Sequence, residues 1–216
     1  MTITAKRKKT VAPPLILASA SPRRAQLLTE AGYRFTVIPS TDRELTHRPH
    51  SIPVELWPAC VAFCKAFAIK AYARRDSIIL AADTIVVIDG KILNKSANRA
   101  AAKRMLSLLS GKRHRVLTGL ALICRNHRRM AVAESVLQMR RLSQSDLDAY
   151  LDSQLWRGKA GAYGIQDERS GHDPFVRLIS GEWSNVVGLP LELLKALIAS
   201  LDNYSHPSIR ANPANC

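Results

Sequence analysis

Short apolar runs alternate with amphipathic segments along most of this chain, and that alternation predicts an α/β protein. The first apolar run, Leu-Ile-Leu-Ala at 15–18, has the length and composition of a buried strand. Strands are predicted at 15–18, 35–38, 77–88, 115–124, 130–139 and 175–179, and helices at 22–31, 53–75, 96–109, 143–152 and 190–201. Because strands and helices follow one another without any internal repeat, a sheet with helices around it is expected.

Residues typical of helix ends and turns mark the limits of these segments. Pro22 follows Ser21, a good N-cap residue, and is suited to the first position of a helix. Ser96 is predicted to cap the third helix, and Ser143 with Asp146 forms a capping pair for the fourth. The hydrophobic pattern and the end signals therefore agree on where the elements lie.

The order of these segments predicts one globular unit, at 14–202, without a long linker. The segment 1–13 is basic and the segment 203–216 is polar and contains proline, so both are expected to be disordered tails. With 216 residues, 47% of them hydrophobic, the chain is long enough to form a packed core.

Composition also excludes several classes of protein. No apolar stretch approaches the roughly 20 residues that cross a bilayer, and the N-terminus lacks the apolar region of a secretory signal. None of the four cysteines forms a C-x-x-C pair. Cys60 and Cys64 are four apart on a predicted helix and are expected to be core thiols, which favours the reducing cytosol over an oxidising compartment.

The chain is strongly basic, with a formal net charge of +15 and a pI of about 10.2. Such a charge favours a polyanionic partner, either nucleic acid or a nucleotide. The basic residues are scattered over tails and turns, however, and no zinc-finger spacing, RNA-binding aromatic pattern or helix-turn-helix stands out. A solvated basic surface is therefore favoured over a nucleic-acid interface.

The start of the helix at 22–31 carries the clearest candidate for anion binding. Arg23 and Arg24 lie in its first turn, where cations oppose the helix dipole, so local stability does not explain them. The backbone N–H groups of the helix end, the hydroxyls of Ser19 and Ser21 and the two guanidiniums could together bind a phosphate. The alternative is a solvated pair of arginines. The segment is not a Walker loop, because it has no glycine-rich run and no Gly-Lys-Ser/Thr.

Asp83 is unusual because it interrupts a nearly continuous apolar strand, Ile-Ile-Leu-Ala-Ala-Asp-Thr-Ile-Val-Val-Ile. A carboxylate in such surroundings is costly unless a metal, a cation or hydrogen bonds compensate. A catalytic or metal-binding role is favoured, and a buried structural aspartate that caps a neighbouring helix is the alternative.

Three lysines stand in contexts that suggest a common site. Lys65 lies among apolar residues of a predicted helix, Lys95 follows the strand that holds Asp83, and Lys159 begins the segment Lys-Ala-Gly-Ala-Tyr-Gly-Ile-Gln. If they converge with the two arginines and Asp83, they would form a site for a triphosphate and its metal. Periodicity does not show that they converge, and each lysine alone is also typical of a surface position.

Several segments together resemble the Maf-type nucleoside triphosphate pyrophosphatases. They are ASASPRR (18–24), AFCKA (62–66), AADTIVV (81–87), MLSLLSGKRHRVLTG (105–119), KAGAYGIQ (159–166) and NVVGLPLELL (185–194). They occur in the family's order and span about residues 15–200, nearly the whole globular part. The resemblance is therefore specific and covers most of the chain.

The resemblance implies a fold and a reaction. The fold is a twisted mixed sheet flanked by helices, in two lobes with a central cleft. The reaction is hydrolysis of a nucleoside triphosphate between the α and β phosphates, assisted by Mg²⁺ or Mn²⁺, which take oxygen ligands. Asp83 matches the acid that activates water or holds the metal, and Glu44 matches a second acidic residue. Arg24, Lys65 and Lys95 would neutralise charge on the phosphates.

The resemblance also implies a base preference. Arg23, Thr84 and Gln166 match the subgroup that acts on dTTP and UTP, and a glutamine amide can pair with the donor–acceptor edge of a pyrimidine. With Lys159, Ser19 and Ser21, these residues complete the expected substrate site. The expected partner is a nucleoside triphosphate in the cytosol, with no membrane; a homodimer stays open, and nucleic-acid binding is the less favoured alternative.

Three positions depart from the family pattern. Ser96 replaces a proline after Lys95, Gly158 replaces an aspartate before Lys159, and Arg43 replaces the first member of an acidic pair. The missing carboxylates weaken the case for full metal affinity. A protein of low activity, or a nucleic-acid-binding or cell-division regulatory protein on a Maf-like scaffold, therefore stays open as an alternative to the enzyme. A third alternative, an RNA-binding protein that uses its basic tails, is disfavoured by the 6% aromatic content.

Overall fold

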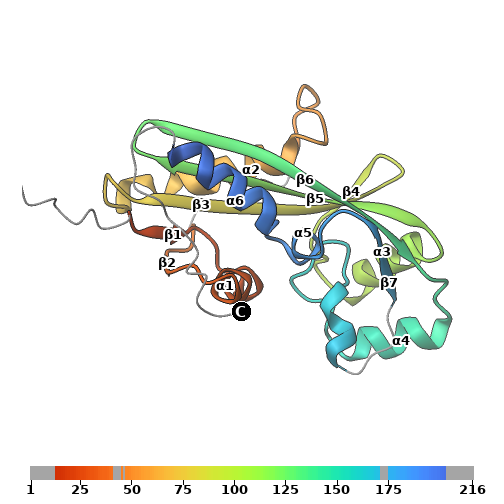
Figure 1. Cartoon of the computed structure of the whole chain (residues 1–216). Helices are drawn as coiled ribbons and strands as arrows, with labels where there is room; N and C mark the ends of the chain where they lie inside the picture. Colours follow the sequence, from red (N-terminus) through yellow and green to blue (C-terminus); the bar gives the residue numbers. More distant parts are fainter. Residues whose placement is uncertain (1–12, 41–44, 46, 171–174, 203–216) are drawn as a thin grey trace, which may run out of the picture.

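A seven-stranded mixed sheet forms the centre of the computed structural model, which describes residues 13–40, 45, 47–170 and 175–202 (Figure 1). The strand order is β2-β1-β3-β5-β6-β7, with β4 paired to the outer part of β3. β1 runs parallel to β2 and β3, and the other pairs are antiparallel. The strands are β1 (Leu15–Leu17), β2 (Phe35–Val37), β3 (Ile78–Ile88), β4 (Lys91–Leu93), β5 (Arg113–Cys124), β6 (His127–Met139) and β7 (Val176–Ser180). The expected mixed α/β class is confirmed.

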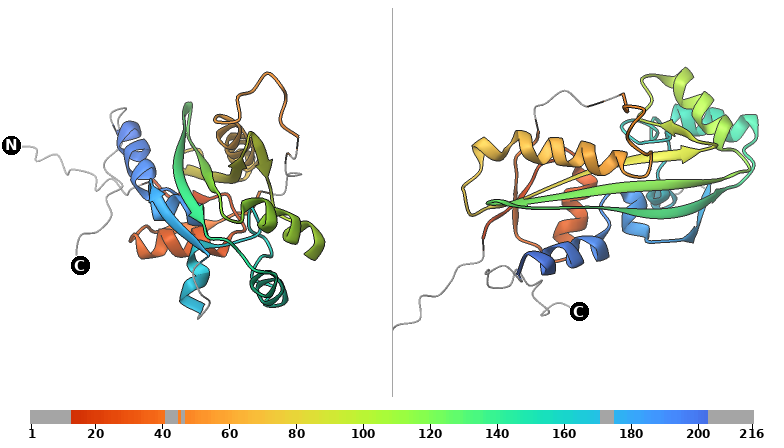
Figure 2. Two further views of the ribbon diagram at one scale, coloured as in Figure 1. Left: turned by 90° about the vertical axis from the view of Figure 1, so that its right-hand side faces the viewer. Right: turned by 90° about the horizontal axis from the view of Figure 1, so that it is seen from above.

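Helices cover both faces of the sheet. Figure 2 shows α2 on one face and α1 with α6 on the other. The helices are α1 (Pro22–Glu30), α2 (Trp57–Ala68), α3 (Arg99–Leu109), α4 (Gln144–Asp152), α5 (Trp183–Val187) and α6 (Leu191–Asp202), with 3₁₀ turns η1 (Lys70–Tyr72) and η2 (Ile165–Ser170). In the part of the chain that the structure describes, no helix is long and apolar enough to cross a membrane.

The central strands are buried on both faces, which explains their continuous apolar sequence. Successive residues of a strand point to opposite faces. In β3, Ile79 and Ala81 pack with Ala62 and Ala66 of α2. Leu80, between them, packs in the larger core on the other face, together with residues of α1, α3 and α6.

Gly119 allows α2 to approach the sheet closely. A Cβ atom at this position of β5 would lie 2.1 Å from the backbone nitrogen of Ala59. Because Gly119 pairs with Asp83 of β3 in the sheet register, this close approach of α2 lies beside the aspartate. The absence of a side chain at Gly119 thus allows α2 to lie close to Asp83.

Two helix starts differ from the sequence predictions. α2 begins at Trp57 rather than at 53, because Pro58 lacks an N–H group and is tolerated only in the first helical turn. α3 is capped by Asn98, whose side chain accepts a hydrogen bond from the Ala101 N–H at 2.9 Å, and the prediction of Ser96 as the cap is wrong. The predicted capping box of Ser143 and Asp146 is confirmed.

Cys60 and Cys64 are not core thiols. Cys60 is half-buried and Cys64 is exposed. Alanines at 59, 62 and 66 occupy the face of α2 that packs on the sheet, so residues 60 and 64 lie outside it. The expected tails fall almost entirely outside the described residues, at 1–12 and 203–216.

Candidate active site

Arg24 is fixed at the start of α1 by hydrogen bonds from three of its nitrogens. Its Nε donates to the carbonyl oxygen of Gly188 at 2.8 Å, Nη1 to the Ser19 hydroxyl at 3.1 Å, and Nη2 to the Thr84 hydroxyl at 3.2 Å. The Ser21 N–H also donates to the Ser19 hydroxyl, at 3.2 Å. These bonds tie the loop after β1 to β3 and to the loop before α6, so the guanidinium is held in one orientation.

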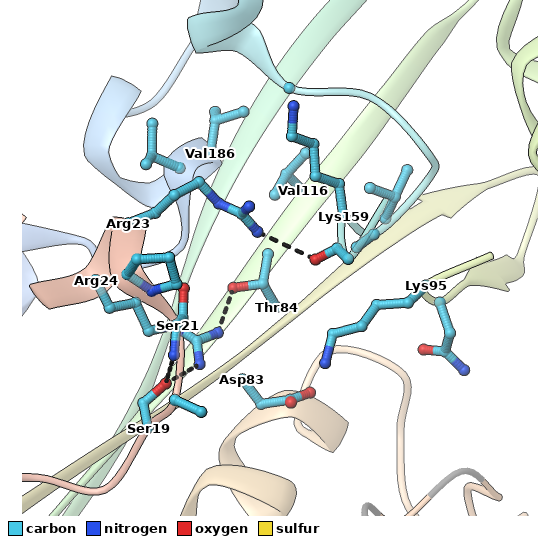
Figure 3. A pocket seen from close by; sticks show the side chains of 18 of the residues that line it. Ser19, Ser21, Arg23, Arg24, Asp83, Thr84, Lys95, Val116, Lys159 and Val186 are labelled. Carbon is cyan, nitrogen blue, oxygen red and sulfur yellow. Dashed lines mark hydrogen bonds between the residues drawn. The ribbon is translucent and has the colours of Figure 1, made fainter. Parts of the chain in front are cut away.

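Asp83 lies in the middle of β3 and pairs with Lys65 of α2. The Lys65 ammonium donates to Oδ1 of Asp83 at 2.6 Å, and the two side chains are only 19% and 13% exposed. Lys95 extends towards Asp83 from the other side of the pocket (Figure 3). The cost of placing a carboxylate in this apolar strand is therefore offset by cations, as the sequence led us to expect.

The segment that contains Lys159 and Gln166 forms a further wall. The Lys159 ammonium donates to Oδ1 of Asp167 at 2.5 Å, and Tyr150 of α4 donates to Oδ2 at 2.5 Å. A backbone bridge between Lys95 and Ala160 joins this wall to the segment after β4.

One cavity of about 680 Å³ collects the predicted site residues. It is lined by every predicted site residue that the structure describes: Ser19, Ser21, Arg23, Arg24, Lys65, Asp83, Thr84, Lys95, Lys159 and Gln166. Glu44 and Arg43 lie outside the described residues. The convergence that periodicity could not show is thus present, whereas the role of each residue stays a prediction.

The pocket is electropositive. Arg157 adds a sixth cationic side chain to the five predicted ones, and Asp83 is the one carboxylate among the described lining residues. Burial lowers the pKa of Arg23, which donates to the carbonyl oxygen of Gly158 at 3.2 Å. Burial also lowers the pKa of Lys159, against the opposing effect of Asp167. Such a pocket is suited to a polyanion, whose charges would compensate the crowded cations.

The donor set is compatible with a hard divalent metal only if the ligand supplies further oxygens. Among the described residues, no group of three His, Cys, Asp or Glu side chains is placed to hold a metal. Mg²⁺ is, however, often bound through one or two carboxylates together with substrate phosphates and water. Asp83 could supply such a carboxylate at the edge of a phosphate site.

Sequence reasoning missed four residues that support the pocket. Asp167 binds both Lys159 and Tyr150, as described above, and Tyr163 lines the cavity while its hydroxyl lies 2.6 Å from His114 Nε2. Asp167 directly follows the segment that carries the resemblance, and that was its only signal. His114 and Tyr163 lie within two of the motifs, at 105–119 and 159–166, but nothing in their spacing singled them out, and Tyr150 lies outside the motifs and gave no signal.

The sheet and the pocket define a class of protein: an α/β protein with a cationic pocket that is suited to a phosphorylated ligand and has one carboxylate, Asp83, among its described lining residues. The family described as Maf-like protein matches residues 14–201, and the chain belongs to this family. This finding confirms the resemblance drawn from the sequence motifs.

Curated relatives carry one consistent name. A dTTP/UTP pyrophosphatase from Rhodopirellula baltica is 42% identical over 211 residues, which cover 94% of this chain and 91% of the relative. One from Symbiobacterium thermophilum is 43% identical, with 89% and 95% covered. A third, from Bacillus anthracis, is 42% identical, with 83% and 91% covered. The chain thus aligns with nearly the full length of each.

Proposed function

We propose that this protein is a nucleoside triphosphate pyrophosphatase that hydrolyses dTTP and UTP between the α and β phosphates, releasing the monophosphate and pyrophosphate. Three relatives at 42–43% identity bear the name dTTP/UTP pyrophosphatase. The observation that carries the proposal is the pocket itself, in which the predicted catalytic and phosphate-binding residues meet.

Asp83 is the proposed general base. Lys65 holds one carboxylate oxygen at 2.6 Å, which fixes the orientation of the group towards the pocket. A water molecule that donates a proton to the carboxylate becomes the nucleophile at a phosphorus atom. Lys95 and Arg24 would stabilise the negative charge that moves to the phosphate oxygens and to the leaving pyrophosphate.

A divalent metal, Mg²⁺ or Mn²⁺, is part of the proposal. Asp83 would be its ligand in the described part of the chain, and Glu44, outside that part, is the second proposed ligand. When bound, the metal would neutralise phosphate charge and lower the pKa of a coordinated water. Removal of divalent metal with EDTA is therefore expected to abolish pyrophosphate release, and added Mg²⁺ or Mn²⁺ to restore it.

We propose that the nucleobase of the substrate binds next to Gln166, and that Arg23 and Thr84 lie at the same end of the substrate. The amide of Gln166 can both accept from N3–H and donate to O4 of thymine or uracil. Cytosine presents the opposite pattern, and a mispaired buried polar group costs about 1–3 kcal/mol.

Pyrophosphate release from dTTP, UTP, CTP, ATP and GTP tests the proposal. We expect dTTP and UTP to be cleaved well ahead of the others, and Gln166→Ala to flatten that ranking. Gln144→Ala, an exposed glutamine of α4, is the matched control and should keep the wild-type ranking. A purine preference, or a Gln166→Ala variant with the full pyrimidine preference, would contradict the base assignment. DNA binding without any pyrophosphate release would favour the regulatory alternative.

The architecture, assembly and location complete the proposal. Residues 14–202 form the catalytic unit, in two lobes, with the pocket as the central cleft between the α1–β3 side and the 157–166 side. A cytosolic location is supported by the three described cysteines, which are free thiols. The homodimer left open by the resemblance is tested by multi-angle light scattering.

A further inference from the structure

Asp167 is a buried carboxylate just behind the wall of the pocket. It is 7% exposed and Lys159 is 8% exposed, and their charged atoms lie 2.5 Å apart. Its second oxygen accepts from the Tyr150 hydroxyl, and burial together with Asp167 raises the pKa of Tyr150, so that this hydroxyl stays a donor. Both carboxylate oxygens are therefore committed to protein contacts.

The side chains that make these contacts lie around Gly164. A Cβ atom at Gly164 would lie 2.8 Å from Nε2 of Gln166 and 2.9 Å from both the Asp167 Oδ1 and the Lys159 Nζ. Three side chains thus converge on a glycine that leaves no space for a side chain of its own. The amide of Gln166 is packed within the same small volume as the Lys159–Asp167 ion pair.

Lys159 receives no carboxylate from the residue before it in the chain, which is Gly158. The carboxylate that lies beside the ammonium in this molecule comes from position 167 instead. A buried lysine without such a partner would be costly, since breaking a buried pair leaves an uncompensated charge.

We infer that Asp167, held by Tyr150, is a positioning residue that anchors Lys159 and so fixes the 159–167 loop from which Gln166 enters the pocket. The inference rests on the proposed function for its consequence, which is base selectivity. Lys159 in this arrangement acts first as the anchor of the loop, and Asp167 determines specificity through Gln166 without touching the substrate.

Asp167→Asn tests the anchor, because it removes the charge and keeps the shape. Without nucleotide, amide hydrogen exchange in segment 159–167 is expected to be about tenfold faster than in the wild type. The ratio of kcat/KM for dTTP to that for CTP is expected to fall about tenfold, which corresponds to 1.4 kcal/mol of discrimination. Asp148→Asn, which removes a partly exposed carboxylate paired with Lys103, is the matched control and should change neither quantity.

Tyr150→Phe provides a second variant, which keeps the packing against Phe175 and removes only the hydroxyl. Like Asp167→Asn, it should make amide exchange in segment 159–167 faster and lower the ratio of kcat/KM for dTTP to that for CTP. Wild-type exchange in segment 159–167 of both variants would overturn the anchor, and faster exchange with an unchanged dTTP/CTP ratio would overturn its link to specificity. If the wild type itself shows no pyrimidine preference, the proposed function fails, and the exchange data alone decide on the anchor.

Discussion

Asp83 places a carboxylate in the middle of a strand whose neighbouring residues are almost all apolar. The strand around it is apolar and largely buried, yet its carboxylate accepts a hydrogen bond from the Lys65 ammonium and lies on the side of the pocket towards which Lys95 extends (Figure 3). Replacing such a pair by apolar side chains often does not destabilise a protein, so stability alone gives little reason for it. Function is the better explanation of this residue.

Asp83→Asn is expected to fold and to lose activity by roughly 10²–10⁴-fold, the range for removal of a general base. The measurement is pyrophosphate release from dTTP at saturating substrate, with thermal unfolding as the check on folding. Asp89→Asn is the matched control, since Asp89 directly follows the same strand and has an exposed side chain paired with Lys112. Near wild-type turnover in a folded Asp83→Asn variant would show that Asp83 is not the base.

His114 is a residue whose burial has a consequence for stability. Its ring is 2% exposed and lies against Tyr163, and burial lowers its pKa to about 4 from an ordinary value of 6.5. Above pH 6.5 the ring is neutral in both the folded and the unfolded chain. Between pH 6.5 and pH 4 the unfolded chain binds a proton that the folded protein does not. The free energy of unfolding therefore decreases as the pH is lowered through this range.

The free energy of unfolding is expected to fall by about 3 kcal/mol over this range through His114 alone. Urea unfolding at a series of pH values measures it, with His114→Gln compared with the wild type. The variant should be less stable at neutral pH, and the difference should narrow as the pH approaches 4. If the difference in free energy of unfolding between His114→Gln and the wild type stays constant from pH 6.5 to pH 4, the lowered pKa of His114 is contradicted. His50→Gln, at an exposed histidine, serves as the control.

At the scale of elements, the approach of α2 to β5 links packing to the site. Gly119→Ala would place a Cβ atom within 2.1 Å of the α2 backbone, so the helix must shift. We expect a loss of about 1–3 kcal/mol in stability from overpacking. Because Lys65 lies on α2 and pairs with Asp83, we also expect lower activity at temperatures where the variant is fully folded.

Gly90→Ala is the control for this prediction. Gly90 has a φ of +72° and its added Cβ would meet open space, so the change costs roughly 1–2 kcal/mol of backbone strain and leaves α2 in place. Chemical unfolding and dTTP hydrolysis are measured on both variants. Equal activity per folded molecule in the two variants would show that the seating of α2 does not matter for the site.

The elements with strong local signals were predictable, and those held by distant contacts were not. The strand at Leu15–Leu17 and the capping box at Ser143 follow from apolar runs and cap residues. α5, only five residues long, was missed, because its position depends on long-range bonds such as that from Thr118 to the Asn185 carbonyl. The site divides in the same way. The resemblance identified its residues, whereas the bond from Arg24 to the Gly188 carbonyl, 164 positions away, needed the fold.

At the scale of the whole molecule, the net charge of +15 acts together with the local charge of the pocket. Six cationic side chains and one carboxylate line the cavity among the described residues. A field of one sign focused into a cleft attracts a polyanion and accelerates its association. The basic character that first suggested nucleic acid is therefore equally consistent with capture of a triphosphate.

This electrostatic capture predicts a strong dependence on salt. Raising KCl from about 20 to about 200 mM should lower kcat/KM for dTTP about tenfold, mainly through KM, because screening weakens attraction between solvent-exposed charges. dTMP, used as a competitive inhibitor, carries less charge, so its inhibition constant should change less over the same range. Arg177→Gln, which removes an exposed charge on β7 outside the pocket, should preserve most of the salt effect on dTTP. If dTTP and dTMP respond equally to salt, or if Arg177→Gln removes the effect, the cationic pocket is not the source of the capture, and the general basic surface is.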